Sequence, residues 1–171
     1  MVNRFVVIAL GAVAATAAIA PRLSTGGAGA ATGESIYTAD IAKAKRQGGG
    51  DELVLQRDDT GQFYLTATIG HEDVTFLVDT GADLVALTEE TAERLGVLPA
   101  EDRFLPLMKT ASGTGYGAPI MLDSVEIGGA TYRQVEAVVM KGLATDLMGQ
   151  SVLGRVGALE MTGDSMVIRP S

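Results

Sequence analysis

The sequence has no cysteine and no tryptophan, and its only histidine is His71. Without cysteine the chain can form no disulfide, no zinc–thiolate site and no cysteine nucleophile. A single histidine cannot build a histidine-rich metal site, and His71 lies in the polar run 70–73, which is typical of a solvated turn. A Ser-His-Asp hydrolase would depend on that one turn residue. We therefore predict neither a metal nor a cofactor.

Positive charge is also scarce. The chain has 171 residues with 13 Lys and Arg against 21 Asp and Glu, which gives a formal net charge of −8. A protein that holds a phosphate backbone needs the opposite balance, so we expect no nucleic-acid partner. The composition therefore argues against much of the usual enzyme chemistry, and the carboxylates of Asp and Glu are the remaining candidates for a catalytic group.

No apolar run reaches the length of an ordinary membrane span. The longest, residues 5–20, has 16 apolar or small residues, whereas about 20 are needed to cross the hydrocarbon core of a bilayer. Because the run follows the basic Arg4, residues 1–21 are predicted to be either an N-terminal membrane anchor or a cleaved signal peptide. The second alternative would use Ala15-Thr16-Ala17 as its cleavage site. In both cases the rest of the chain is exported.

The remaining chain divides into a linker and one domain. Residues 22–50 are rich in glycine, alanine, serine and threonine, and we interpret them as a flexible linker. Residues 51–171 show the apolar–polar alternation that half-buried strands require. A turn at residues 58–61 is expected to join the first two strands as a hairpin, and residues 161–166 to form the last hairpin. The predicted strands are Leu53–Leu55, Phe63–Ile69, Val74–Val78, Leu84–Leu87, Phe104–Thr110, Ile120–Ile127 and Tyr132–Met140.

Two short helices are predicted in this domain. Thr88 can cap a helix over Glu89–Leu95, which has acids in its first turn and is followed by Gly96. A second helix is expected at Ser151–Val156. Many short strands with so little helix predict an all-β barrel or sandwich.

The segment with the clearest chemical signal is Asp79-Thr80-Gly81, which interrupts two apolar stretches. A carboxylate is thereby placed at a turn inside an otherwise dry environment, where it can take part in proton transfer. The threonine hydroxyl and the glycine backbone can hold it there, since glycine permits a sharp turn. Asp, Thr and Gly are also ordinary turn residues, so the tripeptide alone favours a plain β-turn. Its apolar flanks and the segments further along the chain favour a site.

With those segments included, residues 51–171 resemble the retropepsin-like aspartic proteases. Phe76–Leu87 is similar to their catalytic strand-loop-strand, and Thr110–Gly115 is a glycine-bearing hairpin tip where the family has its flap. Leu147–Leu153 is similar to their second signature, two hydrophobic residues and a glycine leading into a short helix. The resemblance implies a retropepsin-like closed β-barrel lobe with one or two short helices, active as a dimer.

The resemblance also implies roles for individual residues. Asp79 would be the catalytic aspartate, and Thr80 and Gly81 would hold its loop. Ala82 and Asp83 would border the main chain of the substrate, and Ser112 and Gly113 would lie on the flap. Retroviral members usually have an arginine after the glycine of the second signature, whereas this chain has Gln150. A charged pair between that position and Asp83 therefore does not follow from the resemblance.

Aspartic protease chemistry needs two carboxylates that share one proton around a water molecule. The 121 residues from 51 to 171 contain one Asp-Thr-Gly and are too few for two lobes. The second Asp79 must then come from another copy of the chain across a two-fold axis. The sequence thus predicts a homodimeric aspartic endopeptidase that acts on polypeptides.

The resemblance looks closest to a bacterial branch in which one such domain follows an N-terminal membrane segment and a linker. It implies a single-pass inner-membrane protein with the protease domain on the periplasmic side, or a protein secreted to the periplasm after signal cleavage. Two other functions stay open. One is a non-catalytic envelope module that holds peptide in the same groove, and the other is a monomeric envelope domain in which Asp79 is structural.

Overall fold

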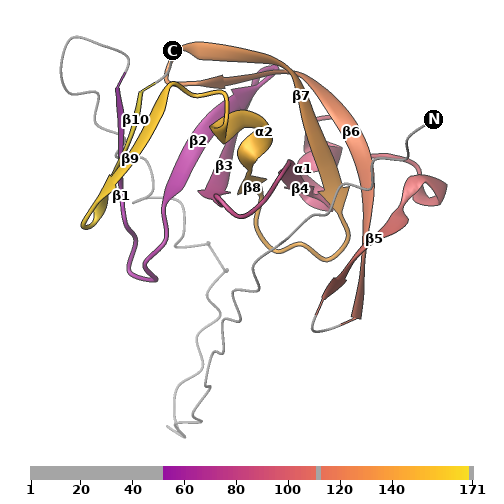
Figure 1. The fold of residues 1–171 in the computed structure, drawn as a ribbon. Coiled ribbons are helices and arrows are strands. Elements are labelled where there is room, and N and C mark those ends of the chain that lie inside the picture. Colours follow the sequence, from indigo (N-terminus) through magenta and orange to yellow (C-terminus); the bar gives the residue numbers. More distant parts are fainter. Residues whose placement is uncertain (1–51, 111–112, 170–171) are drawn as a thin grey trace, which may run out of the picture.

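The part of the chain that the computed structural model describes, residues 52–110 and 113–169, is built mainly from β-strands (Figure 1). The predicted anchor and linker over residues 1–50 lie outside the described residues. Two short α-helices, α1 (Glu89–Arg94) and α2 (Gln150–Leu153), and a 3-10 helix over Glu101–Arg103 join the strands. The strands are β1 (Leu53–Gln56), β2 (Tyr64–Ile69), β3 (Glu72–Val78), β4 (Val85–Thr88), β5 (Leu105–Thr110), β6 (Gly113–Ile127), β7 (Ala130–Met140), β8 (Leu147–Met148), β9 (Ala158–Thr162) and β10 (Ser165–Arg169).

The larger sheet closes on itself. Its seven strands run in the order β2-β3-β8-β4-β7-β6-β5, and β2 also pairs with β6 where Thr68 lies opposite Glu126. Alternate residues of β2 point inward, so that Leu65, Ala67 and Ile69 are all buried. Phe76 of β3 is fully buried in the same core, and burial of such a side chain stabilises the fold by about 1.5–3 kcal/mol. The predicted all-β closed barrel is confirmed.

The smaller sheet corrects one predicted pairing. Leu53–Leu55 was expected to form a hairpin with Phe63–Ile69, but β1 pairs along its whole length with β10, which in turn pairs with β9. Strand pairing with the segment that leads into β2 is limited to one isolated bridge, between Arg57 and Phe63. The alternation of Leu53–Leu55 indicates a strand, but it contains no information about which distant strand provides the partner.

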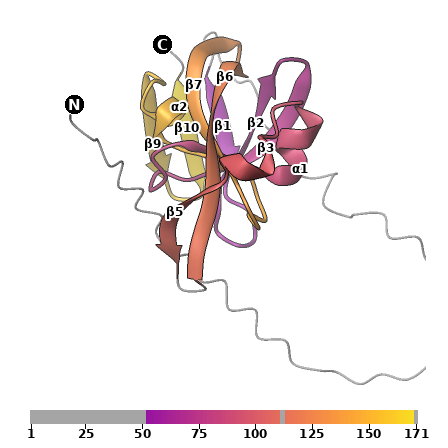
Figure 2. The same cartoon turned by 90° about the vertical axis from the view of Figure 1, so that its right-hand side faces the viewer.

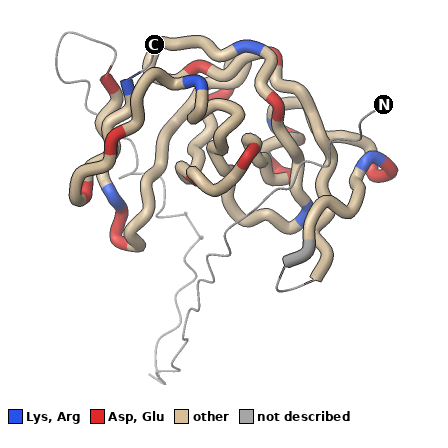
Figure 3. The backbone as a smooth tube through the Cα atoms, viewed as in Figure 1, with Lys and Arg blue, Asp and Glu red and all other residues tan. Residues whose placement is uncertain are grey.

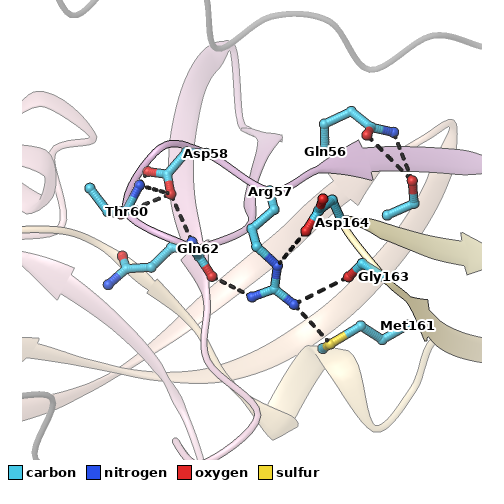
Figure 4. A network of polar contacts seen from close by, with 10 residues as sticks. Gln56, Arg57, Asp58, Thr60, Gln62, Met161, Gly163 and Asp164 are labelled. Atoms are coloured by element: carbon cyan, nitrogen blue, oxygen red, sulfur yellow. Dashed lines mark hydrogen bonds and ion pairs between the residues drawn. The ribbon is translucent and has the colours of Figure 1, made fainter.

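The turn between β1 and β2 is present and holds the smaller sheet to the barrel (Figure 4). The guanidinium of Arg57 lies 4.5 Å from the ring centre of Phe63, donates to the carbonyl of Gly163 and pairs with Asp164 at 3.6 Å. Burial raises the pKa of Asp58, but hydrogen bonds from Gln62 and Thr60 outweigh it, so its pKa lies below the ordinary value. The β9–β10 turn and the start of β2 are thus joined through one arginine.

Of the two helices, α1 follows its prediction closely. The hydroxyl of Thr88 accepts the N–H of Thr91 at 3.1 Å, and Gly96 follows with a φ of +70°. In contrast, α2 begins one residue earlier than predicted, because Gly149 takes the N-cap position, and it ends at Leu153, before the C-cap Gly154.

Strand β6 begins at Gly113 rather than at the predicted Ile120. Glycine has a low strand propensity, which hides this part of the strand in the sequence. In the structure a Cβ on Gly115 would lie 2.8 Å from Met108, and one on Gly117 would lie 2.6 Å from Met140. The two glycines therefore leave the room that neighbouring methionines fill.

Candidate active site

Asp79 lies where three strands meet. It follows β3, and the loop over residues 79–84 leads into β4. The short strand β8 lies between these two, parallel to β3 and antiparallel to β4 (Figure 1). The two distant segments that suggested the site from sequence, residues 76–87 and 147–153, are thus brought together in the middle of the barrel wall.

Three hydrogen bonds hold Asp79, one to strand β8 and two within the loop. The N–H of Asp79 donates to the carbonyl of Met148 at 3.1 Å, and its own carbonyl accepts the N–H of Ala82 at 3.2 Å. Its side-chain Oδ1 accepts the N–H of Gly81 at 2.9 Å. Asp79 is half-buried, and within the described chain Oδ2 has no hydrogen-bond partner. The loop therefore fixes one carboxylate oxygen, and the other oxygen can bind a proton or a reacting group.

The far end of this loop is fixed by α2. The N–H of Gln150 donates to the carbonyl of Ala82, and the N–H of Ser151 donates to the carbonyl of Asp83, both at 2.8 Å. The hydroxyl of Ser151 accepts the N–H of Val85 at 3.0 Å. A Cβ at position 149 would lie 2.1 Å from the carbonyl oxygen of Leu84, so only glycine allows this approach.

The structure places most of the predicted site residues in this one loop. Thr80 and Gly81 are exposed, Ala82 is buried and Asp83 is half-buried. Among the described residues the Asp83 carboxylate has no hydrogen bond or ion pair. Because position 150 is a glutamine, it makes no charged pair with Asp83, and its side chain contacts the Thr80 carbonyl instead.

The predicted flap is a hairpin of β5 and β6 that projects from the barrel (Figures 1 and 2). Gly113 begins β6 and pairs with Thr110. Ser112 lies outside the described residues. Gly113 thus lies near the tip of the hairpin, which is a separate element from the loop that carries Asp79.

An apolar cluster lies next to the loop on the outer face of the barrel. Its buried members are Ala86, Val138, Met140 and Leu147. Leu77, two residues before Asp79, and Leu84, within the loop, are partly buried against it. The carboxylate thus has an apolar surface beside it.

The distribution of charged residues does not identify the site. Acidic positions outnumber basic ones and are spread around the described chain rather than gathered on one face (Figure 3). No three His, Asp or Glu side chains of residues 52–110 and 113–169 gather closely enough to hold a metal ion. A polar hollow of about 430 Å³ lies beside α1, lined by Asp73, Thr75, Arg94 and others, and Asp79 is not among its lining residues.

Asp146 is a residue that the sequence did not single out. It is only 8% exposed, and its carboxylate accepts the N–H of Thr88 and the hydroxyl of Thr91, both at 2.7 Å. Its carbonyl accepts the N–H of Leu77. Asp146 thereby connects the start of α1 to the strands that carry Asp79, and only its burial, which the sequence does not reveal, sets it apart from the other acids.

Replacing Asp146 by alanine is expected to lower the free energy of unfolding by about 2–3 kcal/mol, because one buried donor and one partly buried donor lose their acceptor. Urea unfolding measures this change. The exposed Asp123 of β6, which has no hydrogen bond or ion pair among the described residues, provides the control: Asp123→Ala should change it by less than about 0.5 kcal/mol. Equal effects of the two variants would contradict the structural role of Asp146.

Comparison with known proteins gives the same picture. Residues 65–155 match a family described as gag-polyprotein putative aspartyl protease. An uncharacterized protein of Sinorhizobium sp is 42% identical over 123 residues, covering 71% of this chain and 53% of that protein. An uncharacterized protein of Rickettsia prowazekii is 33% identical over 118 residues, covering 68% and 51%. The chain therefore spans about half the length of these curated relatives.

A solved structure supports the fold as well. The crystal structure of a retropepsin-like aspartic protease from Rickettsia conorii is similar, with a TM-score of 0.59 and 30% sequence identity. The likeness covers 68% of this chain and 89% of that one.

Proposed function

Because the chain belongs to the retropepsin-like aspartic protease family, we propose that it is an aspartic endopeptidase that hydrolyses polypeptides. The observation that carries this proposal is the Asp79 carboxylate, held on one oxygen by Gly81 while the other oxygen has no partner in the described chain. The apolar cluster beside the loop supports a polypeptide substrate, since its partly buried members, Leu77, Leu84, Leu107, Met108 and Leu143, keep accessible apolar surface that can contact apolar side chains flanking the bond to be cut.

The mechanism needs a second carboxylate, and the proposed source is Asp79 of a second copy. The two carboxylates hold one proton between them. The ionised one accepts a proton from water as the water oxygen attacks the carbonyl carbon, while the protonated one donates a hydrogen bond to the carbonyl oxygen. Transfer of a proton to the amide nitrogen then releases the amine product. Since each chain has one Asp-Thr-Gly, the active form is a homodimer.

The other residues of the loop and hairpin have supporting roles in this proposal. Thr80 and Gly81 keep the loop in shape, Ala82 and Asp83 border the substrate main chain, and Ser112 and Gly113 cover it from the hairpin. None of these steps uses a metal or an organic cofactor.

Cleavage of a peptide library by the full chain, with and without a chelator, tests the proposal. We expect cleavage in both conditions and identical product patterns. Peptides that bind without being cut would favour the alternative function, a non-catalytic peptide-binding module. Cleavage that the chelator removes and a divalent cation restores would contradict the mechanism.

We also propose that residues 1–21 anchor the protein in the inner membrane with the protease domain in the periplasm. No helix of the described residues is long and apolar enough to cross a bilayer, and the proposed anchor lies outside them. Arg4 favours an N-terminus that stays on the cytoplasmic side. Membrane fractionation and N-terminal sequencing of the mature protein test this, and a soluble protein that begins near Ala18 would show cleavage instead.

A further inference from the structure

The side chain of Gln150 reaches from α2 to the loop that carries Asp79. Its Nε2 donates a hydrogen bond to the carbonyl oxygen of Thr80 at 3.0 Å. That carbonyl belongs to the peptide group between Thr80 and Gly81, whose N–H donates to Oδ1 of Asp79 at 2.9 Å. A peptide group is planar and rigid, so its two ends turn together. A bond that fixes the carbonyl therefore also fixes the direction of the N–H.

The neighbouring hydrogen bonds of the loop do not depend on this side chain. Asp79 N–H donates to the carbonyl of Met148, and the Ala82 carbonyl accepts the N–H of Gln150. Both bonds join main-chain atoms, so neither uses the side chain at position 150. Between these two fixed points, the Thr80–Gly81 peptide is held on one side by Gln150 and on the other by the Asp79 carboxylate.

We propose that Gln150 is a positioning residue for Asp79, acting through the Thr80–Gly81 peptide. It keeps the Gly81 N–H directed at the carboxylate, which fixes the carboxylate plane before the substrate arrives. The bond also polarises the peptide group, because hydrogen bonds in a chain strengthen one another. This inference rests on the proposed protease function, since only a reacting carboxylate needs so exact a direction.

The substitution Gln150→Met removes the donor and keeps a side chain of similar length. We expect kcat to fall by about three- to tenfold, the effect of losing one hydrogen bond in the reacting arrangement. KM should stay within about twofold, because the substrate does not touch Gln150 in this proposal. Gln150→Arg keeps an N–H donor at the same place and should restore kcat to within about twofold of wild type.

A matched control separates positioning from a general loss of stability. Thr68→Val removes one surface hydrogen bond, from the Thr68 hydroxyl to Asp73 at 2.7 Å. Thr68 pairs with the opposite end of β3 from Asp79, about 20 Å away at the rise of a strand. This variant is expected to keep the kcat of wild type. A fall in kcat equal to that of Gln150→Met would mean that any lost hydrogen bond slows the enzyme, and it would overturn the proposal.

The rigidity of the Thr80–Gly81 peptide group can also be measured by a method that does not depend on enzyme activity. In the wild type the ¹⁵N order parameter of the Gly81 amide should be that of a rigid backbone, about 0.85. Gln150→Met should lower it and Gln150→Arg should not. If wild type cleaves no peptide, the protease function fails, whereas the order parameter still decides whether Gln150 holds this peptide.

Two results would overturn the inference while leaving the protease function intact. One is a Gln150→Met variant with the kcat and the Gly81 order parameter of wild type. The other is a Gln150→Arg variant as slow as Gln150→Met. Should Gln150→Met fail to fold, Gln150→Asn gives the same measurements, because its amide is one methylene too short to reach Thr80.

Discussion

Asp79→Asn is expected to remove peptide cleavage, lowering kcat by about 10⁴-fold or to background. An amide can neither accept a proton from water nor share one with a second carboxylate. The carbonyl oxygen of the new side chain can still accept the N–H of Gly81, which is the one hydrogen bond that the Asp79 side chain makes in the described structure. The free energy of unfolding should therefore change by less than about 0.5 kcal/mol.

The measurement is kcat on a peptide that wild type cleaves, together with thermal unfolding of both proteins. Asp123→Asn, the same change at an exposed acid outside the site, serves as control and should keep full activity. A folded Asp79→Asn protein that cleaves as fast as wild type would remove the assignment of Asp79 as catalytic. A variant that still binds the peptide but no longer cuts it would distinguish loss of chemistry from loss of the binding groove.

The sequence predicts those parts of the site that depend on neighbouring residues. Asp79 to Asp83 lie in one loop because two apolar strands flank them, and Thr88 caps α1 because its hydroxyl is three residues from the N–H it accepts. Such local rules predict a strand, a helix cap or a turn from residues that are close together in the sequence. They explain why the loop and α1 agree with the structure.

Features that depend on distant partners were missed. The pairing of β1 with β10 joins residues more than 100 positions apart, and the strand pattern of Leu53–Leu55 fits several partners equally well. Asp146 is one of 21 acids in the sequence, and only the folded chain buries it against Thr88 and Thr91. The hydrogen bond from Gln150 to Thr80 likewise spans 70 residues, so that its role follows from the tertiary structure alone.

The proposed dependence on a second copy predicts the other large effect. Specific activity should rise with protein concentration until the dimer is saturated and then level off, because in this proposal a monomer contains half of the reacting pair. An N-terminal anchor would favour pairing by confining the subunits to a membrane and raising their effective concentration. The solubilised full chain should therefore show the concentration dependence most clearly.

A mixing experiment tests the shared pair directly. Asp79→Asn subunits are added to a fixed amount of wild type under conditions where dimers exchange. If one Asp79 from each subunit is needed, random pairing leaves about half of the activity at equal amounts and about a quarter at a threefold excess of the variant. Adding Asp123→Asn subunits instead should increase the activity in proportion, which excludes an effect of crowding or substrate depletion. Undiminished activity in the presence of demonstrated mixed dimers would mean that one Asp79 suffices, and the shared-carboxylate mechanism would then be wrong.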